Sequence, residues 1–438
     1  MEQEQQISKL GSLSRQEIAI VVQLAFANFI STITFSAIAP YYPLEGTKRG
    51  LTESQNGLVF GIFELTMFIV SPIAGKLINK TGSKNMFVVG LVLTSLMALL
   101  FGLLDMLPNH LFYYGSLIVR VFIAFGDAAF VTSSFTIVAT RFQQNCVMVI
   151  SIFETAAGVG FLAGPPIGGI LYEWGGFKLP MVVLSVALGV CAVASACLIT
   201  PDGHDEEKEY KKSSGVLRIL KLPGVWIHLY SVLACAMCLS LMEPTLSDHL
   251  SSFKMGPFLV GLLFLLCGCV YTLTAPMWGF LTKRLTRKSI VVIIGTALTS
   301  VGMFLIGPAP FTQLEKTILI ISIALVLLGI ACAALYAPSF QNCLDVVKNS
   351  GLYSKYECDS CVSGIFQSAW ALGAFLGPTF GGLATQYIGF ASTAAYIGAL
   401  QAIYIIVLIV YYAIVGEVQT ESEPEDKEER DCEKQLNN

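Results

Sequence analysis

A few charged residues stand inside stretches of sequence that are otherwise apolar. Four of them are acids, Glu64, Asp127, Glu154 and Glu243, and one is a base, Arg120. An ionisable side chain in hydrocarbon costs about 2.5–3.5 kcal/mol on insertion scales, and its presence there points to function. Since Arg120 can neutralise one acid, up to three carboxylates remain that need protons or a cationic ligand. Burial favours their protonated form, so the expected chemistry is an exchange of protons for an organic cation.

Three of these acids also have a purely structural interpretation. Asp127 could simply pair with Arg120, and Glu154 could form a buried hydrogen bond to a neighbouring helix. Glu243 precedes Pro244 near a helix end, so it could be interfacial. Arg120 is expected to organise the acids rather than to bind a ligand.

Two further polar residues are candidates for the same site. Gln367 stands at the position that matches Glu154 in a repeat described below, and Asp345 ends an apolar segment. Aromatic rings could add cation–π contacts of about 0.5–2 kcal/mol each, although each ring taken alone could equally serve packing. The candidates for such an aromatic cage are Tyr41, Tyr42, Tyr271, Tyr336, Trp278 and Trp370.

The elements that must position these residues are membrane helices. The chain has 438 residues, of which 55% are hydrophobic and 13% charged, with a mean hydropathy of +0.70; a soluble domain carries roughly 25% charged residues. Apolar runs of about twenty residues cross a bilayer as helices. Such runs are expected at 17–39, 56–78, 86–107, 112–136, 147–172, 178–200, 223–247, 256–281, 289–310, 315–341, 359–386 and 390–416.

The sequence therefore predicts an all-α membrane protein with twelve transmembrane helices in two pseudo-symmetric six-helix bundles. The bundles are expected at 17–200 and 223–416, joined by a cytoplasmic linker at 201–222, with a cytoplasmic tail at 1–16 and an acidic one at 417–438. With both termini in the cytoplasm, fifteen Lys and Arg residues fall in cytoplasmic loops and five in the opposite loops. Short cytoplasmic loops are enriched in these residues, which favours that orientation.

The two halves share a glycine pattern. "GPPIGGILYEWGGF" (164–177) and "GPTFGGLATQYIGF" (377–390) have Gly, Pro and a final Phe at identical spacing. Residues four apart share one helix face, and a glycine face lets a neighbouring backbone approach closely in lipid. We expect these stripes to be gating contacts, with static packing as the alternative. They comprise Gly160, Gly164, Pro165 and Gly168 in one half, and Gly373, Gly377, Pro378 and Gly381 in the other.

A second shared motif joins helices within each half. "GKLINKTGSKNM" (75–86) and "GFLTKRLTRKSI" (279–290) share Gly, Leu and Lys. Its basic residues are expected to set the orientation and to act as a conformational latch. The motif residues are Gly75, Asn79, Lys80, Gly82, Lys84, Gly279, Arg287 and Lys288.

These motifs resemble those of the major facilitator superfamily. The paired stripes resemble its antiporter motif, the 75–84 segment its loop between helices 2 and 3, and "RVFIAFGDAAF" (120–130) its helix 4 arginine motif. Together with "LMEPTLSDHL" (241–250) they resemble the vesicular amine transporter family, nearest its polyamine branch. The resemblance implies proton-driven uptake of amines into an acidic vesicle or lysosome. Asp345 matches a family aspartate.

The sequence also departs from that family. Asn79 stands where the loop motif usually has an acid, and Ser83 and Lys84 where it has two bases. "ANFISTITFS" (27–36) lacks the helix 1 acid of the monoamine transporters, and Gln367 replaces a helix 11 aspartate. These differences weigh against a catecholamine-type site and favour polyamines, whose dispersed charges suit dispersed acids.

Several function classes are excluded or disfavoured. No nucleophile–base constellation, metal set or phosphate loop is present, so neither an enzyme nor a cofactor is expected. The net charge of −4 gives no reason to expect nucleic acid as a partner. The expected partners are a small organic cation, protons and membrane lipid, and a monomer is expected. The alternatives are a plasma-membrane multidrug or organic cation exporter and a non-transporting receptor or scaffold on a transporter fold.

Overall fold

The structure is a computed structural model that describes residues 14–142, 145–200, 216–285, 289–308, 314–350 and 355–415. Within these ranges, twelve helices have 18 or more residues. Those of the first half are α2 (Arg15–Ser36), α4 (Glu53–Thr81), α5 (Ser83–Leu103), α6 (Asn109–Arg141), α7 (Cys146–Gly175) and α8 (Lys178–Leu198). Those of the second half are α10 (Pro223–Leu250), α11 (Pro257–Arg284), α12 (Ser289–Ile306), α13 (Ile318–Asn349), α14 (Lys355–Ile388) and α15 (Phe390–Val415).

The predicted class, all-α with twelve long helices in two bundles, is confirmed. Among the described residues, eleven of the helices are long and apolar enough to cross a membrane. The twelfth, α14, begins in a polar segment, "KYECDSC". Two short helices, α3 (Tyr42–Lys48) and α9 (Val216–Ile219), complete the helical elements named below.

Local sequence signals set several helix boundaries. Ser14 and Glu17 form a capping box at the start of α2, which satisfies backbone N–H groups that have no partner within the helix. Gly176 separates α7 from α8, and Gly389 separates α14 from α15, with φ of 68° and 79°. Glycine reaches positive φ without strain. These two glycines occupy matching positions of the shared glycine pattern, so the sequence repeat corresponds to a repeated turn between helices.

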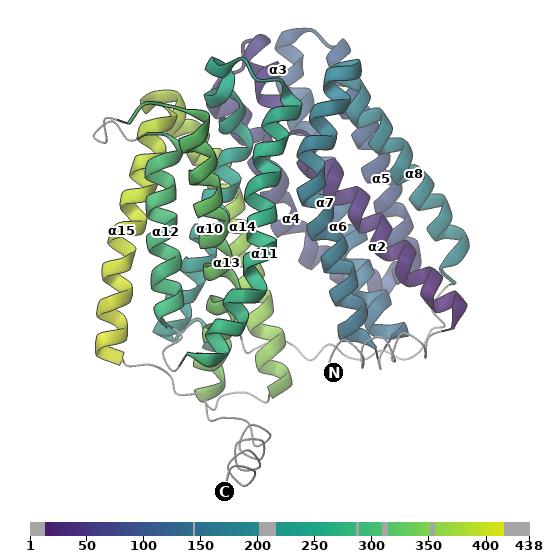
Figure 1. The fold of residues 1–438 in the computed structure, drawn as a ribbon. Helices are drawn as coiled ribbons and strands as arrows, with labels where there is room; N and C mark the ends of the chain where they lie inside the picture. Colours follow the sequence, from purple (N-terminus) through teal and green to yellow (C-terminus); the bar gives the residue numbers. More distant parts are fainter. Residues whose placement is uncertain are drawn as a thin grey trace, which may run out of the picture.

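The twelve helices form two bundles that meet along a seam (Figure 1). In the first, α5 packs on α6 and α8, and α2 packs on α7; in the second, α12 packs on α13 and α15, and α10 packs on α14. Two helix pairs make up most of the seam, α4 with α14 and α7 with α11. The bundles meet closely at the end that carries α3, called here the closed end.

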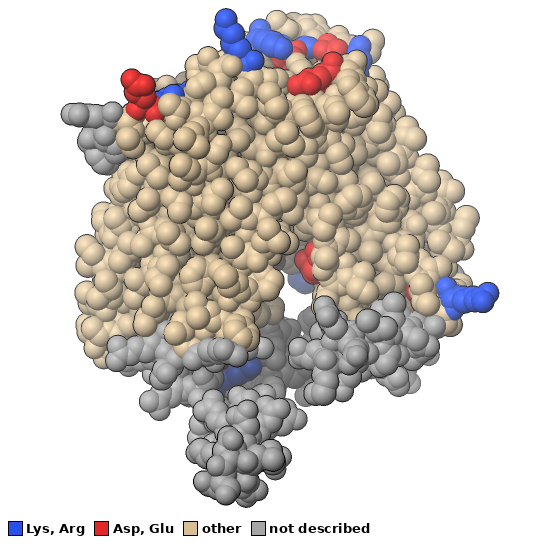
Figure 2. Space-filling view, in the orientation of Figure 1, with Lys and Arg blue, Asp and Glu red and all other residues tan. Residues whose placement is uncertain are grey.

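At the other end the bundles separate. Figure 2 shows a hollow between them there, with acidic and basic atoms on its wall. The first residue of α2 and the last of α15 lie at this end, called here the open end (Figure 1). The molecule therefore surrounds a central space that is accessible from one side.

The glycine stripes pack inside the bundles rather than across the seam. A Cβ atom on Gly168 would overlap the Ala37 carbonyl oxygen, just beyond α2, and one on Gly373 would overlap the Leu233 oxygen of α10. The predicted close packing is therefore present, between α7 and α2 and between α14 and α10. Whether the stripes act in gating stays a prediction.

Different glycines line the seam itself. A Cβ on Gly57 would overlap the Pro378 oxygen, and one on Gly382 would lie 2.7 Å from the Glu53 oxygen. Between α7 and α11, a Cβ on Gly261 would lie 2.5 Å from the Pro165 oxygen. The seam thus brings backbone against backbone, and the two stripe prolines contact glycines of the opposite half.

Candidate functional site

Arg120 is the buried cation at the centre of the molecule. It lies on α6 and is only 2% exposed. Its Nε donates a hydrogen bond to the Val59 carbonyl oxygen of α4 at 3.3 Å, while its Nη2 has no hydrogen-bond partner among the described residues. The guanidinium carbon lies 5.3 Å from the Phe35 ring centre and 4.9 Å from that of Phe63. Aromatic faces attract such a cation, so these rings hold it in place without neutralising it.

Three carboxylates lie within electrostatic range of this cation. Glu243 from α10, Glu64 from α4 and Asp127 from α6 all interact electrostatically with Arg120, and Glu64 also interacts with Glu243 across the seam. In the described part of the chain, neither glutamate has a hydrogen-bond partner. Both are partly exposed. The structure thus brings together four of the five charged candidates, with an excess of acid.

Asp127 is held differently from the two glutamates. It is 6% exposed and accepts hydrogen bonds from Ser31 of α2 at 2.7 Å and Thr94 of α5 at 3.2 Å. No ion pair joins Asp127 to Arg120 in the ranges described. The structural alternative, in which Asp127 simply pairs with Arg120, therefore does not fit this conformation. Ser31 and Thr94 were not singled out from the sequence, since hydroxyl residues are common in membrane helices.

Glu154 occupies a second place in the hollow. Its side chain on α7 is exposed, it has no hydrogen-bond partner among the described residues, and it interacts electrostatically with Tyr336 of α13 in the opposite half. It is absent from the set of acids that interact with Arg120. Glu154 therefore lies within electrostatic range of an aromatic residue of the opposite half, Tyr336, rather than of the arginine.

The aromatic candidates divide into two groups. Tyr336 packs edge-on against Trp370 of α14, with ring centres 5.3 Å apart at 90°, and it interacts with Tyr271 of α11. These three rings are half-buried. Phe366, which the sequence did not single out, adds a ring 5.4 Å from Tyr336.

The other three aromatic candidates lie within bundle cores. Tyr41 and Tyr42 are fully buried near the closed end, where Tyr41 stacks on Tyr172 with ring centres 5.0 Å apart. Trp278 is 8% exposed and donates from Nε1 to the Ile330 oxygen at 3.2 Å. Their rings have no open face toward the hollow in this conformation.

The remaining sequence candidates lie away from Arg120. Gln367 is exposed on α14, one turn before Trp370. Asp345 is 3% exposed near the end of α13 and accepts a hydrogen bond from Gln341 at 3.1 Å.

The residues of the loop motif lie at helix ends. Gly82 separates α4 from α5, and Gly75 and Gly279 lie in α4 and α11. Lys80 is exposed and Lys84 is half-buried. The side chain of Asn79 and residues Arg287 and Lys288 lie outside the described residues.

Hydrogen bonds between the halves hold the closed end together. Thr47 of α3 donates to an Asp248 oxygen of α10 at 3.0 Å, and Ser247 donates to the Ala39 oxygen at 2.9 Å. The backbone N–H of Phe258 donates to Glu173 at 3.1 Å. These contacts hold the two halves together at the end opposite the opening of the hollow.

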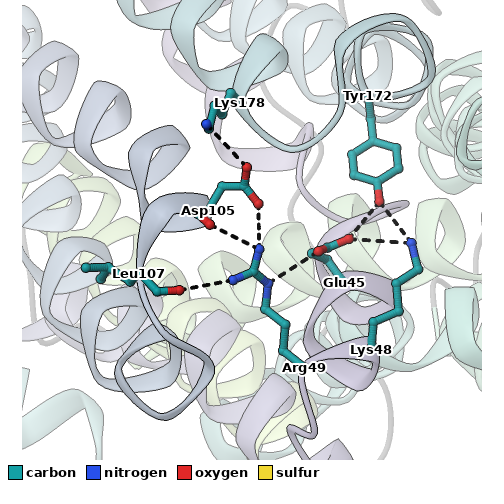
Figure 3. Close-up of polar contacts among 7 residues, drawn as sticks. All are labelled: Glu45, Lys48, Arg49, Asp105, Leu107, Tyr172 and Lys178. Carbon is teal, nitrogen blue, oxygen red and sulfur yellow. Dashed lines mark hydrogen bonds and ion pairs between the residues drawn. The ribbon is translucent and has the colours of Figure 1, made fainter.

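A polar network fixes α3 to the first half (Figure 3). Arg49 binds Glu45 at 3.3 Å and Asp105 at 2.5 Å, and Asp105 also lies 3.6 Å from Lys178. Tyr172 donates to Glu45 at 2.8 Å. Because Asp105 follows α5 and Lys178 begins α8, the network connects α3 to both helices.

The network shifts the pKa of Glu45. Burial raises the pKa of this carboxyl, but the hydrogen bond from Tyr172 and the charges of Lys48 and Arg49 outweigh burial. The net pKa is below its ordinary value, so Glu45 stays ionised in mild acid.

Twelve long helices in two bundles around a charged hollow define a multi-pass membrane transporter rather than an enzyme. The sequence profile of the Major Facilitator Superfamily matches residues 24–356 and 244–435. The chain belongs to this superfamily.

Named relatives extend the comparison. The human protein called MFS-type transporter SLC18B1 is 30% identical over 388 residues, 88% of this chain and 84% of that protein. The rat chromaffin granule amine transporter is 24% identical over 358 residues, 80% of this chain and 64% of that protein.

Solved structures share the fold. A bacterial homologue of the human lysosomal transporter Spinster, in an inward-facing and occupied conformation, matches with a TM-score of 0.74 at 12% identity, covering 94% of this chain and 100% of that one. The nucleoside transporter NupG matches with a TM-score of 0.70 at 12% identity, covering 90% and 99%.

Proposed function

We propose that this protein is a proton-coupled antiporter of organic amines, polyamines above all, working as a monomer by alternating access. The observation that carries the proposal is the charge balance around Arg120. Glu64, Asp127 and Glu243 all interact electrostatically with a single guanidinium, and Glu154 adds another carboxylate in the same hollow. An excess of acid among membrane helices requires protons or a cationic cargo.

The mechanism follows from where the acids stand. Glu64 and Glu243 belong to opposite halves and interact across the seam, so a change in how the halves meet changes how strongly the acids repel. Binding of a cation or of protons relieves the same repulsion. The two cargoes then compete for the same carboxylates, which couples their movements in opposite directions.

The direction follows from orientation and compartment. With both termini in the cytoplasm, the open end faces the cytoplasm and the closed end faces the interior of a vesicle or lysosome. An acidic interior supplies protons that displace the amine after the molecule opens there. The chromaffin granule amine transporter among the relatives supports this choice.

A second candidate function keeps the fold and changes the location. Multidrug resistance protein 2 of Bacillus subtilis is 25% identical over 312 residues, 68% of this chain and 75% of that protein. That similarity favours export of organic cations at the plasma membrane as the alternative.

Transport by the purified protein in liposomes tests both candidates. With an inside-acid gradient, labelled spermidine, serotonin and a lipophilic cationic drug are offered from outside. We expect spermidine to accumulate and the accumulation to disappear when the gradient is collapsed. Preference for the drug would favour the exporter, and uptake that survives collapse would contradict proton coupling.

Matched variants test the residues. Glu243→Gln and Glu64→Gln each remove one carboxylate and should lower proton-driven uptake by at least about tenfold, the equivalent of losing one strong charge interaction. Glu315→Gln makes the same chemical change at an exposed position before α13 and should transport normally. Equal activity of all three would contradict the proposed acid site.

A further inference from the structure

The acids of the hollow lie at two different depths. Glu64 lies about three helical turns from the first residue of α4, and Glu154 about six turns from the last residue of α7. Both of these helix ends are at the closed end. At the rise of an α-helix, the two residues are about 17 Å and about 32 Å along their helices from that end. Glu154 therefore lies on the order of 15 Å nearer the open end than Glu64 does.

The depths of Arg120, Glu243, Tyr336 and Trp370 show the same two levels. Arg120 lies about three turns from the start of α6 and Glu243 about two turns from the end of α10, which puts both at the deeper level with Glu64. Tyr336 lies about five turns from the start of α13, and Trp370 about five turns from the end of α14. Each of these rings is thus about 27 Å along its helix from the closed end, near the depth of Glu154.

The outer level has the chemistry of an ammonium subsite. Glu154 is exposed and has no cationic partner among the described residues, and it interacts with Tyr336 across the hollow. Tyr336 and Trp370 meet edge to face, and Gln367 is exposed one turn from Trp370. A carboxylate from one half and aromatic rings from the other would enclose an alkylammonium group by charge and cation–π attraction.

We propose that the hollow contains two ammonium subsites, an outer one of Glu154, Tyr336 and Trp370 and a deep one of Glu64 and Glu243, and that together they select linear amines long enough to occupy both. This inference rests on the proposed amine transport and deepens it by adding selection by length. The apolar linker between two amino groups would lie between the levels, and a cation with one charge would leave one subsite unfilled.

Substrate length tests the proposal directly. The reconstituted protein is offered a series of linear α,ω-diamines of increasing length together with n-alkylamines of matched length. We expect the diamine to exceed its matched monoamine in affinity only above a threshold length, with a KM roughly tenfold lower. Equal KM values for the two series at every length would overturn the two-subsite arrangement, whereas no transport of any amine would overturn the proposed function instead.

Variants identify the outer subsite. Glu154→Gln and Tyr336→Leu should each remove the advantage of long diamines over matched monoamines, and Tyr336→Phe should keep it because the ring remains. Trp174→Leu, at a ring that is 72% exposed near the end of α7, is the control and should retain the advantage. An unchanged diamine advantage in Glu154→Gln would contradict the assignment.

Direct binding keeps the test independent of transport. Diamine affinity is measured on the purified variants in nanodiscs, where a defect in conformational change has no effect on the first binding event. The proposal requires that Glu154→Gln binds the long diamine no better than the matched monoamine. Retention of the full difference would overturn it even if transport were lost.

Discussion

Arg120 shows how one residue can organise a site without completing it. Its guanidinium is buried beside aromatic rings and donates to a backbone oxygen, with one terminal nitrogen left without a partner among the described residues. A buried charge without a close counterion costs free energy. The negative charges of Glu64, Asp127 and Glu243 reduce that cost by long-range attraction rather than by direct ion pairs. Because none of these acids is locked in a close ion pair with it, they remain available to bind protons or a cation.

Glu45 gives a pH prediction at the same scale. Its pKa in the folded protein is lowered from the ordinary value of 4.5. Its contribution to stability is therefore complete above the ordinary value and is lost as the pH falls through the lowered value. We expect Glu45→Gln to destabilise the protein in detergent by about 1 kcal/mol from neutral pH down to about 4.5, as for a charged hydrogen bond that is partly exposed to solvent, and to have no effect in stronger acid.

The measurement is thermal unfolding across that pH range, with Glu315→Gln as the exposed control. A destabilisation that faded between pH 7 and pH 5 would show that Glu45 is not held ionised by its network.

The charged residues of the site could be predicted from the sequence, but their contacts with one another and with neighbouring residues could not. Glu64, Asp127, Glu243 and Arg120 stand out because charge is rare in apolar helices. The Ser31 and Thr94 contacts to Asp127 depend on how α2 and α5 pack around α6, which a single sequence does not encode locally. Tyr41 has the same residue type as Tyr336, so composition could not separate the core ring from the one facing the hollow.

At the scale of helices, glycine position decides which surfaces can touch. The four-residue stripes place α7 against α2 and α14 against α10, while Gly57, Gly261 and Gly382 form the seam. The sequence predicted close packing at the stripes, and the Gly57–Gly61 spacing in α4 is a signal of the same kind for the seam. Helix number and type were predictable because hydrophobic length determines them, whereas pairing between distant helices has no local signal.

Gly382→Ala tests the seam. Its Cβ would lie 2.7 Å from the Glu53 oxygen and 3.1 Å from the Gly57 Cα, so α4 and α14 must separate at the closed end. We expect site-directed spin labels at the exposed Lys48 and Lys254 to move apart and proton-driven uptake to fall about tenfold, since a misfit of this size costs about 1–3 kcal/mol.

Gly364→Ala is the matched control, because a Cβ at this position of α14 meets nothing within 4 Å. It should leave both the label distance and uptake unchanged. An unchanged label distance in Gly382→Ala would contradict a seam that depends on backbone contact.

At the scale of the molecule, the hollow and the chain ends share one side. The first residue of α2 and the last of α15 both lie at the open end (Figure 1). The excess of Lys and Arg in the loops at that side favours placing it in the cytoplasm.

Protease protection in intact vesicles checks this orientation. Epitope tags at either terminus should be removed by added protease, and a tag inserted between Leu107 and Pro108, at the opposite end, should be protected until the membrane is dissolved. The reverse pattern would invert the direction of transport proposed above.

The residues on the two sides of the seam also differ, although the two halves share one fold. They keep a common plan of helices and turns, yet the arginine and two of its acids belong to the first half, while the third acid and the aromatic rings belong to the second. A homodimer built from two first halves would have two buried guanidinium groups in one hollow, and it would lack the aromatic rings of Tyr336 and Trp370 opposite Glu154. The two halves therefore share a fold but supply different residues to the site, and neither half can replace the other.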